Sequence, residues 1–329
     1  MNEVTNQDFF TADTVSNLPL RERVGFSVEG RDARDALNQI CEAEDLGVGQ
    51  AWMTMAGAGR TDPLTFYAAA AAQTAKIRLG TAIVPAYPRH PLVTAQQALA
   101  IDDLAPNRLR LGVGTSHRQI IEDSFGIKMG QPLSYLCEYV SVLRGALVDG
   151  SVSHHGKFFD VEFSSQRRAR VPVLVAALGE KAFRNAGGIA DGIISWLCPS
   201  SYLTSTALPA IREGAKGRTV PPLVAHVMVA LSRDKSAVRA TGSKRLGFYA
   251  GSPFYVNMFR AAGLPIVKNT VDPGKLADSL IVSGEEDEVK EKIVELLKRL
   301  DELLIGLVPV SSDANGERKK LLRLIGELR

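Results

Sequence analysis

The stretch from residue 77 to residue 113 restricts the fold of this chain most, because it reads as two buried strands joined by a helix. Residues 77–84 and 109–113 are largely apolar and β-branched, without alternating polar side chains, which is typical of parallel strands covered on both faces. Between them, Pro91 can begin a helix, since the first turn does not need its missing N–H. This βαβ unit predicts a parallel sheet.

The same alternation of strand and helix continues along the rest of the chain. We expect eight strands, at residues 24–28, 48–53, 77–84, 109–113, 171–176, 192–196, 223–231 and 302–308. Helical patterns separate them, a short β excursion is expected at 151–163, and 234–281 departs from the alternation, with an irregular part at 268–275. The pattern predicts an α/β fold, a single (β/α)8 TIM barrel with insertions over residues 21–329. Residues 1–20 form an N-terminal extension, either unstructured or pinned to the barrel by Phe9 and Phe10.

Composition and motifs exclude several classes of protein. The 39 basic and 36 acidic residues give a net charge of +3, too balanced to indicate nucleic acid or an anionic membrane surface as a partner. Three separated cysteines indicate free thiols in a reducing compartment, and no apolar run approaches the ~20 residues of a membrane span. With no secretory signal visible, we expect a cytoplasmic protein.

The sequence also predicts no metal site and no nucleotide-binding loop of the common types. No HxxE, HExxH or Cys/His cluster occurs, and the adjacent His154 and His155 would face opposite ways on a strand. The GxGxxG and GxxxxGK[ST] motifs are absent, which argues against a Rossmann or P-loop protein.

Four separated motifs, in order, carry a family resemblance. They are LGTAIVPAYPRHP (79–91), APNRLRLGVGTSHR (105–118), PVLVAALGEKAFRNAGGIADGIISW (172–196) and RLGFYAGSPFYVNMFRAAG (245–263). With them the chain resembles the bacterial luciferase-like superfamily, and within it the coenzyme F420-dependent oxidoreductases, from about residue 23 to residue 324. The resemblance implies a barrel that holds a deazaflavin or flavin at its C-terminal mouth, with F420 as the cofactor and FMN as the alternative. It also implies a homodimer.

Three places along the chain are candidates for cofactor binding. Gly179 lies between a strand and the start of a helix, where free N–H groups and the helix dipole favour a phosphate, although a tight turn alone would explain this glycine equally well. The resemblance assigns this turn to the phosphate-bearing side chain of the cofactor. It also implies a cis peptide bond at Ala82–Ile83 beneath the ring, where tight barrel packing would otherwise be the simpler explanation. The candidate cofactor-binding residues are Thr81, Ala82, Ile83, Gly112, Val113, Gly114, Thr115, Ala176, Ala177, Leu178, Gly179, Glu180 and Lys181.

His117 is the candidate catalytic residue. It follows a predicted strand end of small residues, and histidine can donate or accept a proton near neutral pH. Related enzymes commonly hold an acidic residue at this position, and an aspartate or histidine where this chain has Thr54 and Met55. Arg118 would disfavour a charged imidazole, and Tyr87 or His90 are alternatives for the proton transfer. Side chains expected to line an apolar substrate pocket are Met53, Met55, Tyr87, Trp196, Phe248, Tyr249 and Phe254.

Taken with the resemblance, these residues predict an F420-dependent oxidoreductase that moves a hydride between the deazaflavin and a small organic substrate. Two alternatives stay open. One is an FMN-dependent luciferase-like monooxygenase on the same fold. The other is a non-catalytic flavin- or deazaflavin-binding protein, because the usual acidic residues are replaced.

Overall fold

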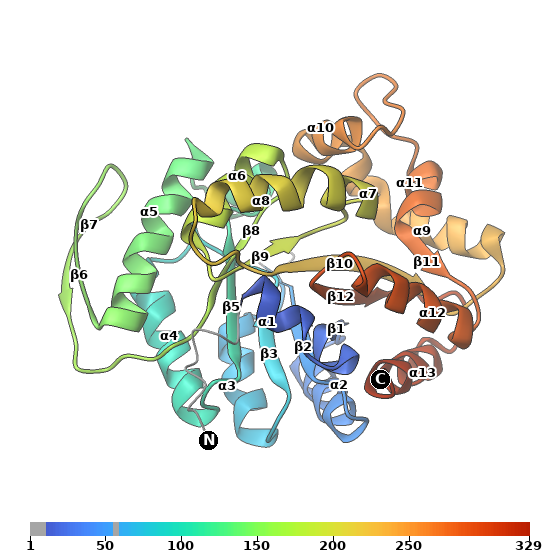
Figure 1. The fold of residues 1–329 in the computed structure, drawn as a ribbon, viewed down its shortest axis with the longest axis horizontal. Coiled ribbons are helices and arrows are strands. Elements are labelled where there is room, and N and C mark those ends of the chain that lie inside the picture. Colours follow the sequence, from blue (N-terminus) through green and yellow to red (C-terminus); the bar gives the residue numbers. More distant parts are fainter. Residues whose placement is uncertain (1–10, 55–58) are drawn as a thin grey trace.

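The computed structural model describes residues 11–54 and 59–329, and its centre is a closed barrel of parallel strands (Figure 1). Within these residues eight strands form the ring, and β10 pairs with both β9 and β12 to close it. In ring order they are β12 (Glu302–Leu307), β1 (Val24–Val28), β2 (Gln50–Met53), β3 (Arg78–Thr81), β5 (Leu109–Gly114), β8 (Val173–Ala176), β9 (Gly192–Ser195) and β10 (Leu223–Ala230). The predicted (β/α)8 barrel is confirmed.

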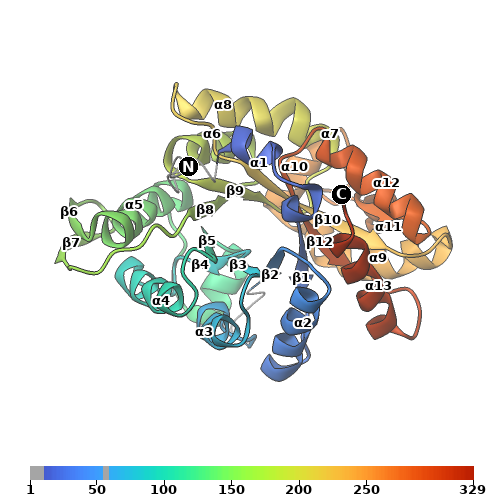
Figure 2. The same cartoon turned by 60° about the horizontal axis from the view of Figure 1, so that its bottom comes forward.

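Helices surround the barrel, as Figure 2 shows. They are α2 (Ala33–Asp45), α3 (Pro63–Gln73), α4 (Pro91–Leu104), α5 (Pro132–Arg144), α6 (Glu180–Ile189), α7 (Ser200–Tyr202), α8 (Leu208–Ala215), α12 (Glu286–Leu297) and α13 (Ala314–Gly326). Their starts follow from local chemistry. The Asp62 side chain accepts the N–H of Thr65, and Pro63 occupies the first turn, so α3 begins where the sequence predicts.

The strand expected at 77–84 is interrupted. The peptide bond between Ala82 and Ile83 is cis, as the resemblance implied. It separates β3 from a two-residue strand, β4 (Val84–Pro85), and both pieces pair with β5. The prediction of one continuous strand was therefore wrong.

A buried polar cluster closes the amino-terminal end of the barrel. Arg110 Nη1 and Nη2 donate to the two carboxylate oxygens of Glu302 at 2.6 and 2.7 Å, and Gln50 bonds both partners at 2.8 Å. Gln50 and Glu302 begin their strands, so the cluster lies at the end opposite the strand carboxyl ends. Removing one partner would leave a buried charge unpaired, so this cluster has a structural role, whereas chemistry in this fold belongs at the other end.

Two insertions depart from the simple alternation. The hairpin of β6 (Ser151–His155) and β7 (Asp160–Ser164) projects beside α5, as predicted (Figure 1). After β10, the chain forms α9 (Lys235–Gly251), α10 (Pro253–Ala261), α11 (Pro273–Leu280) and β11 (Ile281–Ser283), which pairs with the end of β10. The irregular stretch expected at 268–275 was partly wrong, because Asp272 accepts the N–H of Lys275 and Pro273 begins a short helix there.

The N-terminal segment is folded where it is described. It forms α1 (Ala12–Ser16) and a 3-10 turn, η2 (Leu20–Arg23). The N–H of Ala12 donates to the carbonyl of Val220 at 3.0 Å, and Val15 is buried. Phe9 and Phe10 lie outside the described residues. None of the helices in the described part of the chain has both the length and the apolarity needed to cross a membrane.

Candidate active site

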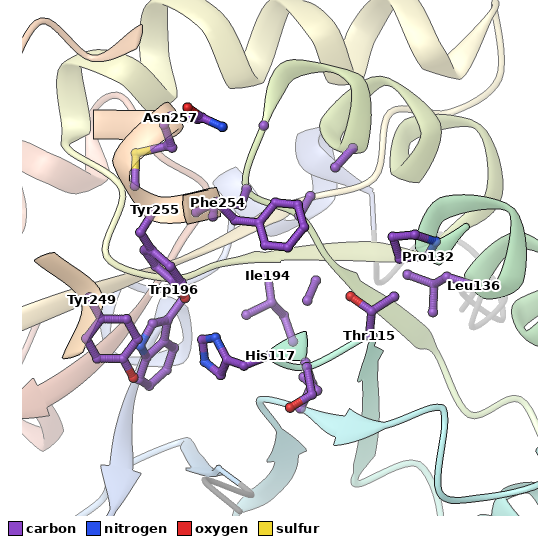
Figure 3. A pocket seen from close by; sticks show the side chains of 18 of the residues that line it. Thr115, His117, Pro132, Leu136, Ile194, Trp196, Tyr249, Phe254, Tyr255 and Asn257 are labelled. Carbon is purple, nitrogen blue, oxygen red and sulfur yellow. The ribbon is translucent and has the colours of Figure 1, made fainter. Parts of the chain in front are cut away.

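A cavity of about 950 Å³ opens at the carboxyl ends of the strands, beneath α9 and α10 (Figure 3). Its lining comes from the ends of β5, β8 and β9, from the start of α5 and α6, and from the insertion. In Figure 3, Trp196, Tyr249, Tyr255 and His117 gather on one side, while Thr115, Pro132 and Leu136 lie on the other. The volume and the mixture of apolar walls with a few polar groups are those of a small-molecule site.

Small residues bring the strands close together under the cavity. A Cβ on Gly112 would lie 2.0 Å from the carbonyl oxygen of Thr81, and one on Gly114 would lie 2.9 Å from Ala176 Cβ. The Thr81 hydroxyl donates to the carbonyl of Gly112 and accepts its N–H, both at 2.8 Å. Above them, Ala82, Ile83 and Ile194 form an apolar part of the lining.

The start of α6 faces the same cavity. Gly179 is its N-cap and has no side chain to satisfy the first N–H groups, and a Cβ there would meet nothing within 4 Å. Glu180 turns along the helix to Arg184 at 2.7 Å, while Lys181 also lines the cavity. Free N–H groups, the helix dipole and an adjacent ammonium group suit a negatively charged group of a ligand.

His117 lies among aromatic rings from the insertion. Its ring centre is 5.1 Å from Phe248, 5.8 Å from Tyr255 and 5.9 Å from Tyr249. Burial lowers the pKa of His117 below its ordinary value, so the imidazole is neutral near pH 7. Arg118, expected to affect it, instead pairs with Glu122 at 2.6 Å. A neutral imidazole has one nitrogen that donates and one that accepts a hydrogen bond.

A second histidine supports the aromatic side of the cavity. The ring of His226, on β10, stacks on Trp196 with centroids 3.7 Å apart and planes 17° apart. Burial, with Arg245 nearby, lowers the pKa of His226 to about 3, so it too is neutral. The stack fixes the plane of the indole that lines the cavity.

The structure brings most of the predicted site residues together. Those that line the cavity are Ala82, Ile83, Thr115, His117, Ala176, Ala177, Leu178, Gly179, Glu180 and Lys181, with Trp196, Phe248, Tyr249 and Phe254. Thr81, Gly112, Val113 and Gly114 lie behind the lining, where they set how closely the strands approach.

Other candidates lie elsewhere. Met53 belongs to the hydrophobic core, and His90 is the N-cap of α4. Tyr87 stacks on Tyr135 with centroids 4.1 Å apart and donates its hydroxyl to the carbonyl of Gly130 at 2.8 Å. Met55 lies outside the described residues.

Sequence reasoning missed several lining residues from the insertion, notably Arg245, Tyr255, Asn257 and Met258. They lie on α9 and α10, and only the folded structure shows which face of these helices covers the barrel mouth. The described residues include no group of three or more His, Cys, Asp or Glu side chains placed to hold a metal ion.

Comparison with known proteins now assigns the class. The family described as luciferase-like monooxygenase matches residues 14–301, so the chain belongs to this family. The match to an uncharacterized protein of Mycobacterium tuberculosis covers 61% of this chain at 28% identity, and spans 65% of that protein, just under two thirds.

Two further relatives carry the names of oxidoreductases. An F420-dependent glucose-6-phosphate dehydrogenase of Nakamurella multipartita is 31% identical over 70% of this chain and 71% of its own length. A 5,10-methylenetetrahydromethanopterin reductase of Methanolobus tindarius is 26% identical over 87% of this chain and 92% of its own.

Solved structures share the fold. An F420-dependent secondary alcohol dehydrogenase, in complex with an F420-acetone adduct, has a TM-score of 0.75 at 18% identity and covers 93% of this chain and 99% of its own. An EDTA monooxygenase from Chelativorans sp. BNC1 has a TM-score of 0.73 at 13% identity, covering 93% and 94%. At these identities the likeness concerns the fold alone.

Proposed function

We propose that this protein is an F420-dependent oxidoreductase that transfers a hydride between the deazaflavin and a small organic substrate. The observation that carries the proposal is the cavity at the barrel mouth, which joins an apolar surface to a helix N-terminus that carries Lys181. Relatives named as F420-dependent enzymes support the choice of cofactor.

The residues present fit such a cofactor. Ala82, Ile83 and Ile194 offer an apolar surface to a planar ring, and the N–H groups after Gly179 with Lys181 suit the anionic side chain. When bound, F420 supplies a ring carbon that accepts or gives a hydride. The chain itself supplies the remaining requirements, which are orientation of the substrate, exclusion of water and movement of a proton.

His117 is the residue proposed to handle that proton. It is neutral, lines the cavity and stands between the barrel wall and the aromatic rings of α9 and α10. Its unprotonated nitrogen can take a proton from the substrate as a hydride leaves, and the imidazolium so formed can give that proton back in the reverse direction.

The FMN-dependent monooxygenase stays the second candidate, because an EDTA monooxygenase matches the fold nearly as well as the alcohol dehydrogenase. Turnover with and without dioxygen separates the two functions. Reduced F420 and reduced FMN are each mixed with the protein and a panel of carbonyl, imine and enone compounds, and cofactor absorbance is followed.

We expect substrate-dependent oxidation of reduced F420 to be equally fast with air excluded. Oxidation that requires both reduced FMN and dioxygen would instead make the protein a monooxygenase. If no cofactor is turned over although one binds, the protein is a binding protein only. The homodimer and the small-molecule partner stay predictions.

A further inference from the structure

One cation is anchored at the aromatic side of the cavity. Arg245, on α9, lines the cavity and places Nη2 2.7 Å from Glu29 Oε2. Its Nη1 donates to the carbonyl of Leu307 at 2.7 Å and to Glu29 Oε1 at 3.3 Å. A guanidinium has five N–H donors, and these bonds use three. The other two N–H donors of Arg245 have no acceptor among the described residues. The Arg245 side chain is 34% exposed, so a ligand can reach it.

Glu29 compensates the charge of this guanidinium. It follows β1, and Gln39 bonds both its backbone N–H and its carbonyl at 3.3 Å, which fixes the backbone of Glu29. An anionic ligand at Arg245 would meet the negative charge of Glu29 at short range. A neutral oxygen could accept an N–H of Arg245 without this repulsion, and a hydrogen bond from a charged donor is stronger than one from a neutral donor.

Apart from Glu29, the side chains that gather on this side of the cavity are aromatic rings. Arg245 lies near enough to His226 to help lower its pKa, and His226 stacks on Trp196. Tyr249 and His117 lie beside Trp196 in Figure 3, and His117 is neutral because it is buried. Phe248 and Phe254 are 48% and 53% exposed, unusually open for large apolar side chains at a cavity. Glu180 and Lys181 follow β8, which stands four strands away from β1 in the ring of eight described strands and is therefore opposite Arg245's partner Glu29.

We propose that Arg245 binds the substrate oxygen, and that this side of the cavity takes a neutral carbonyl compound with an apolar or aromatic body, or the corresponding alcohol. The inference rests on the proposed function. In the reductive direction the carbonyl carbon gains a hydride supplied by reduced F420, the π electron pair moves to the oxygen, and the oxygen takes a proton that reaches it from solvent through His117. The cofactor loses two electrons, which balances the reduction of the carbonyl to the alcohol.

Binding measured on the full-length protein tests this without relying on turnover. Acetophenone serves as the neutral probe and benzoate as the anionic one, each titrated by calorimetry without cofactor and with oxidised F420. We expect acetophenone to bind more tightly than benzoate, and Arg245→Gln to weaken acetophenone binding by about tenfold or more. Arg233→Gln is the matched control, because Arg233 also pairs with a glutamate, Glu288, but does not line the cavity.

Glu29→Gln gives an independent variant. It keeps an amide oxygen for Arg245 but removes the carboxylate charge, so benzoate binding should tighten relative to acetophenone binding.

Tighter binding of benzoate than of acetophenone by the unmodified protein would overturn the inference, as would unchanged acetophenone binding in Arg245→Gln. If Arg245→Gln weakened F420 binding but not acetophenone binding, the guanidinium would be a cofactor-binding group, and this result would also overturn the inference. Arg245-dependent acetophenone binding without any F420 turnover would support this inference while contradicting the proposed function.

Discussion

At the scale of the residue, His117 is the side chain on which the proposed chemistry depends. His117→Ala should lower turnover by about 10²-fold or more, the usual effect of removing a general acid or base. Cofactor affinity should change little, because the apolar surface of Ala82, Ile83 and Ile194 and the start of α6 are untouched. Since burial lowers the pKa of His117, the acid limb of the pH–rate profile should fall below the ordinary histidine value of about 6.5.

His90→Ala is the control for that variant, because His90 is exposed at the start of α4 and does not line the cavity. Steady-state rates and cofactor titrations on both variants separate the roles. If His117→Ala lost only cofactor affinity, His117 would be a binding residue. If neither its turnover rate nor its cofactor affinity changed, both roles would be ruled out.

The ionisation of Asp301 should make the free energy of unfolding depend on pH. Burial raises the pKa of its carboxyl to about 6, although the carboxylate accepts the N–H of Leu223 at 2.9 Å. The native state therefore binds more protons than the unfolded state between pH ~4 and about 6. The contribution of Asp301 to the free energy of unfolding is full below pH ~4 and is lost as the pH rises through about 6.

Asp301→Asn keeps an oxygen for Leu223 and cannot ionise. Urea unfolding from pH 4 to pH 7 should show a flatter stability profile for the variant, with a higher free energy of unfolding at pH 7. An unchanged slope across this window would contradict the assignment.

At the scale of the element, β3 and β5 can approach closely because Gly112 has no side chain. Gly112→Ala would place a Cβ 2.0 Å from the carbonyl oxygen of Thr81, which is backbone and cannot move away cheaply. We expect a loss of about 1–3 kcal/mol in the free energy of unfolding. Gly247→Ala, in the exposed interior of α9 with nothing within 4 Å, should be neutral or stabilising by up to about 1 kcal/mol. Equal stability of the two variants, measured by denaturant unfolding, would show that β3 and β5 do not need the glycine.

The elements also show what the sequence can and cannot predict. Buried β-branched runs and capping residues such as Asp62 are local signals, so the barrel and its helices were predicted from them. The α11 helix was missed because it has only eight residues, although Asp272 and Pro273 are a start signal that could have found it. The family resemblance, not any local pattern, identified the cis bond at Ala82–Ile83.

The site was predicted less completely than the fold, for a physical reason. Residues after strand ends, such as His117 and Gly179, are placed at the mouth by the fold class itself. Arg245 and Tyr255 sit on helices of an insertion, and the periodicity of a helix does not say whether a face covers a core or a cavity. Tyr87, an expected pocket residue, instead closes an aromatic contact with Tyr135.

At the scale of the whole molecule, the barrel and the insertion together make one cavity whose opposite sides have different chemistry. The start of α6 offers N–H groups and Lys181, while the insertion offers aromatic rings and a neutralised guanidinium. This division suits a cofactor with an anionic side chain on one side and a neutral, apolar substrate on the other. The fold is shared with F420-dependent enzymes and with a monooxygenase, so the cofactor decides between the functions.

Equilibrium titration of the purified full-length protein with oxidised F420 and with FMN, followed by calorimetry under one buffer condition, tests this account most directly. The account predicts saturable binding of F420 with a lower Kd than that of FMN, and weaker F420 binding in Lys181→Gln, which removes a cation from the start of α6. Tighter binding of FMN, or F420 binding that does not saturate, would contradict it.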